Sequence, residues 1–355
     1  MVLGHAGAPF THFIYLFHMA VFIIASGFVY KGVSTGKISD IWRFVLKKLK
    51  QLYLPFVICN SIFVLLNNLF IKLNIYTDNA DVLLYVTGGH VSTHNKLGLV
   101  EIIKNIFYGF LFKGSTTMGG ALWFLAILFF VFILYCFFDF IITKFVRKQR
   151  NIWVIHGIIS LVLLAFGFFL SAKSIKILGI EKIASTYWLY SFGHGLSKLR
   201  GLYENWIWKH YLTLMVASFV VLLFLNSFGS ISLSANDYTN PFFFIISSIS
   251  GWCFLYSISF FISKSFAGKP MIYIGQHTLA IMMLHFLSFK LVAVLIVQIY
   301  NFPAYYIAAF PNLNGSEGLW WILYTIIGVS LPLLADYIYR LLKNSIINLR
   351  KKQRL

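Results

Sequence analysis

Residues 117–142, TMGGALWFLAILFFVFILYCFFDFII, decide the fold class of this chain. Asp139 is the only ionisable carboxylate in this run, and a membrane-spanning helix needs about 20 mainly apolar residues. Hydrophobic residues make up 59% of the 355 positions and charged residues 11%, whereas soluble domains carry roughly 25% charged residues. A single water-soluble core cannot hide this much apolar surface, so the sequence predicts a polytopic membrane protein.

The predicted fold is all-α, a transmembrane helix bundle of about nine full spans plus the remnant of a first helix. Met1 to Ala6 is apolar but too short to cross, and residues 1–355 are expected to form a single transmembrane domain with an incomplete N-terminal helix and no appended soluble domain. The stretch 183–197 is the shortest and most polar of the expected spans. The spans are expected at residues 10–30, 52–73, 117–142, 152–171, 183–197, 209–228, 241–262, 271–298 and 318–340.

The positions of Lys and Arg predict the orientation of these spans. One set of alternate loops holds 21 of the 29 basic residues, namely 31–51, 143–150, 198–209, 263–270 and 340–355. The positive-inside rule makes these loops cytoplasmic, together with the C-terminus, in a multi-pass protein of the cell (plasma) membrane. Topology and anionic lipid therefore account for the net charge of +19, and nucleic acid is not expected as a partner.

The cysteines and histidines show no metal-binding spacing. Cys59, Cys136 and Cys253 all fall inside expected spans without a CxxC pair, so the sequence predicts neither a disulfide framework nor a zinc site. No HExxH pattern occurs, and His12 and His18 lie six residues apart without acidic neighbours. No metal site is therefore predicted.

Polar and ionisable groups at membrane depth are costly, so each is a functional candidate. Two alternatives stay open for the histidines: a hydrogen bond between helices, or general-base chemistry near neutral pH. Asp139 and Asp336 lie close to cytoplasmic ends, where they could pair or reach water. The candidates are His5, His12, His18, His156, His194, His277, His285, Lys290, Asp139 and Asp336.

The N-terminal region carries two motifs that resemble a known family. Residues 2–5 read VLGH, and residues 17–19 (FHM) are followed by 26–28 (SGF). They resemble the "VLGH" helix end and the "FHMPLFFFLSG" segment of the membrane-bound acyltransferase 3 family.

Further landmarks agree with this resemblance, which covers essentially the whole chain. Residues 47–55 (KKLKQLYLP) resemble the family's basic stretch ending in Leu-x-x-Pro, and 122–125 (LWFL) its "WFL" helix. Residues 274–281 (IGQHTLAI), followed by Leu284-His285, resemble its "lGxxSlxIYxxH" segment. The wording IYLFHM at 14–19 favours the branch of fucose 4-O-acetylase-like and exopolysaccharide-modifying proteins.

The resemblance implies an integral membrane O-acetyltransferase. Its members transfer an acyl group, commonly acetyl from cytoplasmic acetyl-CoA, to a sugar hydroxyl of a cell-surface polysaccharide or a lipid-linked precursor. A sugar hydroxyl is a poor nucleophile and needs a base within hydrogen-bond reach. His5 is the first candidate for that base or for a transient acyl carrier, and His18 for orienting His5 or the acyl carbonyl. Trp123 and His285 are further site candidates.

The cytoplasmic basic stretch is the expected binding site for the CoA phosphates. The candidates are Arg43, Lys47, Lys48 and Lys50, each of which is equally explained as a topology signal. The chain departs from the family's Arg-x-x-Arg at Gln51, which weakens bidentate phosphate binding. It also departs at the N-terminus, where the full first helix of the family is expected before His5.

Two other functions fit the same composition. One is an exporter or flippase of a polysaccharide precursor, although paired broken helices in two similar halves are not evident. The other is a non-catalytic partner of a polysaccharide synthase. The expected external loop 72–116, which carries His90 and His94, could cover an acceptor site, but solvated loop histidines are the simpler interpretation.

Overall fold

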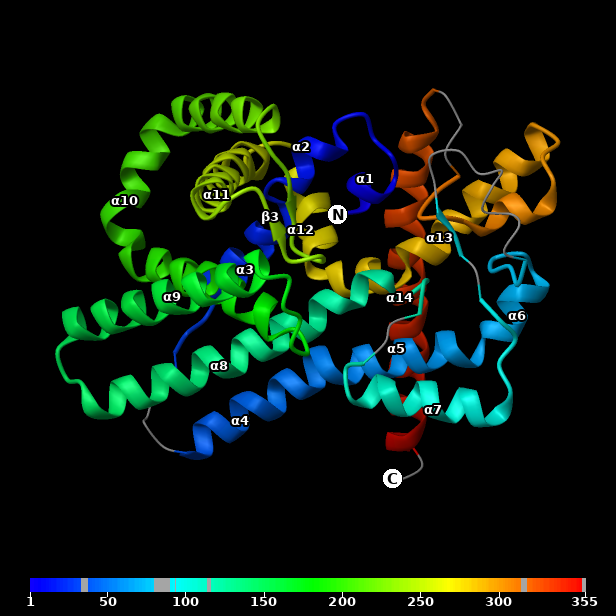
Figure 1. Cartoon of the computed structure of the whole chain (residues 1–355), viewed down its shortest axis with the longest axis horizontal. Coiled ribbons are helices and arrows are strands. Elements are labelled where there is room, and N and C mark those ends of the chain that lie inside the picture. Colours follow the sequence, from blue (N-terminus) through cyan, green and yellow to red (C-terminus); the bar gives the residue numbers. More distant parts are fainter. Residues whose placement is uncertain (33–37, 80–89, 93, 114–115, 314–317, 353–355) are drawn as a thin grey trace. The chain divides into compact units, whose positions relative to one another are not determined.

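The structure is a computed structural model, and it is an all-α helix bundle, as the sequence predicts (Figure 1). It describes residues 1–32, 38–79, 90–92, 94–113, 116–313 and 318–352. Within these ranges, eight helical segments are long and apolar enough to cross a membrane. They are Thr11–Phe28, Ile38–Leu65, Gly120–Phe145, Gln149–Ala172, Ile180–Asn226, Pro241–Ser263, Thr278–Ile299 and Trp320–Ser345.

The chain divides into two compact units. Unit 1 comprises Met1, His12–Phe56 and Trp123–Phe266, and unit 2 comprises Val2–Thr11, Val57–Leu122 and Ala267–Leu355. Each unit is therefore built from segments that lie far apart in the sequence.

Unit 1 is formed mainly by long apolar helices. Its short strands β2 and β3 pair antiparallel, with Ile231 opposite Tyr238. The helices α3, α9 and α11 all pack against α10. The elements are α2 (Thr11–Tyr15), α3 (His18–Phe28), α4 (Ile38–Lys48), the π-helical segment Leu49–Tyr53, α8 (Trp123–Phe145), α9 (Gln149–Ala172), α10 (Ile180–Asn226), β2 (Ile231–Ser232), β3 (Asp237–Tyr238) and α11 (Pro241–Ser263).

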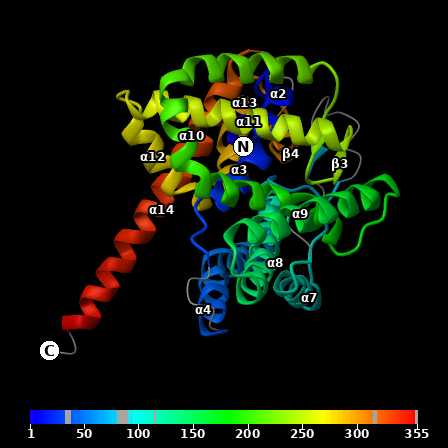
Figure 2. The same cartoon turned by 90° about the vertical axis from the view of Figure 1, so that its left-hand side faces the viewer.

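Unit 2 contains the helices α13 and α14, which pack against each other. Figure 2 shows α14 as one long helix in red near the C-terminal end of the chain. The strands β1 and β4 pair antiparallel, with His90 opposite Phe310. The elements are α1 (Val2–His5), α6 (Asn67–Lys72), β1 (His90–Val91), α7 (Leu99–Phe110), the 3-10 helix Gly120–Leu122, α12 (Gly268–Gln276), α13 (Thr278–Ile299), the 3-10 helix Ala304–Ala308, β4 (Ala309–Phe310) and α14 (Trp320–Lys352). Helix α5 (Leu54–Leu65) begins in unit 1 and ends in unit 2.

The largest difference from the sequence prediction is in α10. The expected spans 183–197 and 209–228 are two arms of one 47-residue helix, which bends where His210 leaves helical geometry at φ −119° and ψ 18°. Figure 1 shows α10 as a strongly curved green helix. Residues 198–209 carry three basic residues, which favours a loop in the prediction, but exposed charged side chains leave the backbone hydrogen bonds of a helix intact.

Two other boundaries also differ from the prediction. Much of the expected loop 31–51 is the amphipathic helix α4, which continues through the π-helical segment into α5. The expected span 271–298 is broken at His277, which separates α12 from α13. From Ile38 on, the residues expected in the loop 31–51 therefore lie on helices.

Glycines allow the helices of unit 1 to approach closely. A Cβ atom added at Gly27 of α3 would overlap the backbone carbonyl oxygen of Tyr190, and one added at Gly193 of α10 would overlap that of Ile24. Small residues at helix contacts let backbones meet in membrane proteins, where lipid supplies no hydrophobic force between helices. The α3–α10 contact therefore depends on these two glycines.

We expect Gly193→Ala to destabilise the protein by about 1–3 kcal/mol, because the added methyl group overpacks the contact with α3. The matched control is Gly201→Ala on the same helix, where an added Cβ meets nothing within 4 Å. That variant is expected to be as stable as the wild type or slightly more stable, since Ala favours helix. Thermal unfolding midpoints of the purified proteins in detergent check this, and equal midpoints for the two variants would contradict it.

Candidate active site

Helices α1 and α13 bring two of the predicted histidines together in unit 2. The rings of His5, at the end of α1, and His285, in α13, are stacked with centroids 5.4 Å apart and planes 26° apart. Phe286 packs against both rings, with its centroid 4.8 Å from His5 and 4.1 Å from His285. The sequence proposed these two histidines separately, and the tertiary structure places them side by side.

His285 is held in one tautomer. It is completely buried, and its Nδ1–H donates to the backbone carbonyl of Ile281, one turn earlier in α13, at 2.9 Å. Its Nε2 is then a lone-pair acceptor, and no described residue is its hydrogen-bond partner. A neutral imidazole with one nitrogen fixed by the backbone and the other unoccupied is suited to accept a proton.

The backbone around the pair is anchored by amide and ammonium donors. Asn312 Nδ2 donates to the backbone carbonyl of His5 at 3.2 Å, and Gly7 supplies a left-handed turn at φ +78° directly after α1. Lys290, also in α13, is buried, and its Nζ donates to the carbonyls of Ile307 at 3.0 Å and Ala309 at 2.6 Å. The buried Nζ of Lys290 therefore holds the 304–310 segment through these two hydrogen bonds.

Two further predicted site residues, His18 and Trp123, lie in unit 1. His18 begins α3, donates from Nδ1 to the carbonyl of Ile14 at 3.0 Å, and stacks on Tyr15 at 5.0 Å. Trp123 begins α8, with the Lys182 ammonium 5.8 Å from its ring. Their roles remain predictions.

The basic candidates lie along α4 and the π-helical segment that follows it. Arg43, Lys47 and Lys50 are exposed, and their i, i+4, i+7 spacing places them on one helical face. Lys48 is half-buried instead, with its Nζ 4.0 Å from the ring centroid of Phe132 on α8. Three of the four predicted phosphate ligands are therefore available to solvent or ligand on a common surface.

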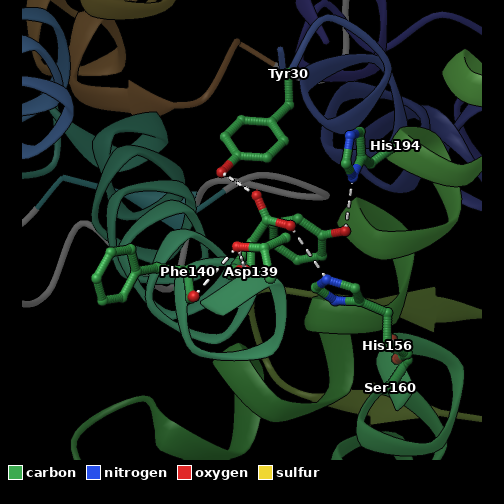
Figure 3. A network of polar contacts seen from close by, with 8 residues as sticks. Tyr30, Asp139, Phe140, His156, Ser160 and His194 are labelled. Atoms are coloured by element: carbon green, nitrogen blue, oxygen red, sulfur yellow. Dashed lines mark hydrogen bonds and ion pairs between the residues drawn. The ribbon is translucent and has the colours of Figure 1, made fainter. Parts of the chain in front are cut away.

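A buried polar network in unit 1 was not predicted. Tyr30 donates its hydroxyl to Asp139 Oδ2 at 2.9 Å, and His156 Nε2 donates to Asp139 Oδ1 at 3.3 Å. In Figure 3 the two side chains approach the carboxylate of Asp139 from different sides. His194 Nδ1 shares a hydrogen bond of 2.8 Å with the hydroxyl of Tyr135, whose ring stacks on His156 at 4.9 Å. Asp139 thus fixes two partners from distant segments.

The sequence gave a partial signal for this network. Asp139, His156 and His194 stood out as polar groups in apolar helices, but their spacing does not reveal that α8, α9 and α10 converge. Two ring nitrogens, His156 Nδ1 and His194 Nε2, are buried without a partner among the described residues. The second acidic candidate pairs as well, since Asp336 Oδ2 lies 2.7 Å from His277 Nδ1 and 2.9 Å from Arg340 Nε in unit 2. Both aspartates are engaged in polar contacts within the bundle.

The eight long apolar helices of the described residues define a multi-pass membrane protein. A family model described as an acyltransferase domain matches residues 1–339. The chain therefore belongs to the acyltransferase 3 family, whose members are membrane acyltransferases. No curated protein and no solved structure shows significant similarity to the chain.

Asp139→Ala is expected to destabilise the protein by about 3 kcal/mol, because the hydroxyl of Tyr30 and the ring of His156 lose their buried acceptor. Glu204→Ala is the control, since Glu204 pairs with Arg200 on the surface of α10, where solvent screens the interaction. Thermal unfolding in detergent should show a lower midpoint for Asp139→Ala and no change for Glu204→Ala. A wild-type midpoint for Asp139→Ala would mean that the network contributes nothing to stability.

Proposed function

We propose that this protein transfers an acetyl group from acetyl-CoA to a hydroxyl of a cell-surface polysaccharide or of a lipid-linked sugar precursor. The observation that carries the proposal is the His5–His285 pair, in which the Nε2 of His285 is buried without a partner among the described residues while its Nδ1 is fixed by the backbone. Membership of the acyltransferase 3 family supports the reaction class.

The pair supplies the base that the reaction needs. In the proposed step, Nε2 of His285 takes the proton of the sugar hydroxyl as its oxygen attacks the thioester carbonyl. The C–S bond then breaks, the new ester is released, and the CoA thiolate recovers the proton from the imidazolium. His5 stacks on the ring that carries this proton, so it is placed either to orient His285 or to act as the base itself.

The donor is a polyanion, and the exposed face of α4 fits its charge. Arg43 and Lys47 of α4 and Lys50 of the following π-helical segment share one helical face that binds the phosphates of CoA in this proposal. In this proposal His18 orients the acyl carbonyl, α4 lies at the cytoplasmic side of a plasma membrane, and the C-terminus is cytoplasmic. The protein is expected to belong to the branch of fucose 4-O-acetylase-like and exopolysaccharide-modifying proteins, so the expected acceptor is a sugar of that kind.

The proposal predicts that His285→Ala and His5→Ala lower acetyl transfer by about 10²–10⁴-fold, as is typical when a general base is lost. The assay measures radiolabelled acetyl passing from acetyl-CoA to membrane glycan, with membrane insertion verified by blotting. The control is His12→Ala, since His12 is exposed and its Nδ1 bonds Asn226 in unit 1.

Wild-type acetylation by both inserted histidine variants would refute the catalytic assignment of the pair. If the wild type transfers no acetyl to the glycan while deletion of the protein abolishes glycan export, the protein functions as an exporter of this glycan and the proposed acyl transfer is refuted.

A further inference from the structure

A polar cavity of about 140 Å³ lies in unit 2, among residues that the proposed reaction does not use. It lies between the α5–α6 region, α7, the segment 94–97, and the residues Lys113 and Thr116. Its polar lining consists of Asn60, Asn67, His94, Asn105, Tyr108 and Thr116, with Lys113 at one side. Three carboxamides around one small cavity are unusual for a protein whose charged and polar side chains are scarce.

The walls of this cavity are held in place by hydrogen bonds. Asn60 Oδ1 accepts from the backbone N–H of Thr116 at 3.1 Å, and Asn67 Nδ2 donates to the carbonyl of Asn95 at 3.0 Å. Helix α7 approaches Asn60 closely because Gly109 has no side chain, and an added Cβ would lie 2.9 Å from Asn60 Nδ2. The amides are therefore positioned before any ligand arrives, which lowers the entropic cost of binding.

His94 is fixed in the same way. Its Nε2 bonds the hydroxyl of Thr117, and its ring stacks on Tyr76 with centroids 4.1 Å apart. The hydroxyl of Tyr76 in turn accepts from the backbone N–H of Met118 at 3.3 Å. Burial lowers the pKa of His94, so its imidazole is neutral at pH 7 and contributes a hydrogen-bonding edge rather than a charge. The simpler interpretation of His94 as a solvated loop residue does not fit this arrangement.

The lining keeps unused hydrogen-bonding capacity. Asn60 and Asn67 are only 2% and 3% exposed, yet each uses just part of its amide in the bonds described above. The amide of Asn105 lines the cavity from α7 and forms no hydrogen bond with the described residues. Since each carboxamide offers both donors and an acceptor, the cavity presents neighbouring donors and acceptors to a ligand.

These properties select the chemistry of a ligand. Hydroxyl groups both donate and accept, so they match a set of fixed amides better than a phosphate or carboxylate does, because those groups only accept. No carboxylate lines the cavity, and no group of three His, Cys, Asp or Glu that could hold a metal occurs in the described residues. The cavity volume lies below the range of pockets that hold drug-sized molecules. A ligand of this cavity is therefore small, about the size of one sugar ring. Tyr108 adds an aromatic surface for the apolar face of that ring.

We propose that the cavity lined by Asn60, Asn67 and Asn105 binds one neutral sugar ring of the glycan acceptor. This inference rests on the proposed function for the identity of the acceptor. The positive-inside rule places segment 72–116 outside, where a cell-surface glycan is available. The sugar belongs either to a polymer or to a lipid-linked precursor, and both present the same hydroxyl groups.

The first test measures binding without any acetyl transfer. Methyl glycosides of neutral hexoses and of N-acetylhexosamines are titrated into the full-length protein in nanodiscs and followed by saturation-transfer NMR. We expect Asn105→Leu to weaken binding by about tenfold, because the variant loses the amide contacts and fills the cavity. Asn344→Leu is the matched control, since Asn344 is exposed on α14.

Two results would overturn the inference. One is equal affinity of the wild type and Asn105→Leu for every glycoside. The other is an affinity that depends on Lys113→Met but not on Asn105→Leu, which would indicate an anion site. The side chain of Asn105 forms no hydrogen bond with the described residues, so the variant is expected to fold, and its thermal midpoint verifies this.

The second test separates this inference from the proposed function. In the acetyl-transfer assay, Asn105→Leu should raise the KM for the acceptor and leave the KM for acetyl-CoA unchanged. Acetyl transfer with an unchanged acceptor KM refutes the sugar site and leaves the acyltransferase intact. Glycoside binding that depends on Asn105 in a protein without acetyl transfer refutes the acyltransferase and leaves the sugar site intact. Comparing a neutral hexasaccharide with an alkyl glycoside below its micellar concentration shows which source, polymer or lipid-linked, the site prefers.

Discussion

The backbone contact between α3 and α10 is the constraint on which unit 1 depends. Gly27 and Gly193 have no side chains, so the two helices meet at their backbones. Tyr30 follows α3 directly, and the contact places its ring 4.9 Å from His194 on α10. The hydroxyl of Tyr30 can then reach Asp139 on α8. In lipid, buried polar groups must find partners inside the protein, so a change in helix spacing would affect this network as well as the packing.

The histidines of the bundle share one arrangement. His156, His194 and His285 each have one ring nitrogen in a hydrogen bond and the other buried without a partner among the described residues. The bonded nitrogen fixes the orientation of the ring, and the other nitrogen is left for a ligand or a proton. In His285 the Nδ1–H donates to a backbone carbonyl, which can only accept, so Nε2 carries the lone pair.

Unit 2 combines two environments that suit different tasks. The His5–His285 pair is surrounded by aromatic rings, where a low dielectric constant strengthens the interaction of a base with a polarised hydroxyl. The amide-lined cavity has Lys113 at one side and otherwise presents uncharged polar groups, which favour recognition of hydroxyl groups. Lys290 contributes to neither, because its ammonium is committed to the backbone of Ile307 and Ala309.

The sequence by itself determined the membrane class, the approximate positions of the spans, the family resemblance and the choice of His5 and His285 as candidates, because hydropathy and local motifs are properties of consecutive residues. It did not determine that residues 198–209 continue α10, because exposed charged residues occur both in loops and on the solvated face of a helix. Only the tertiary structure decided which polar groups meet. Asp139 and its partners Tyr30 and His156 come from different parts of the chain, as do the asparagines of the cavity. Helix packing, which no local pattern encodes, brings such residues together.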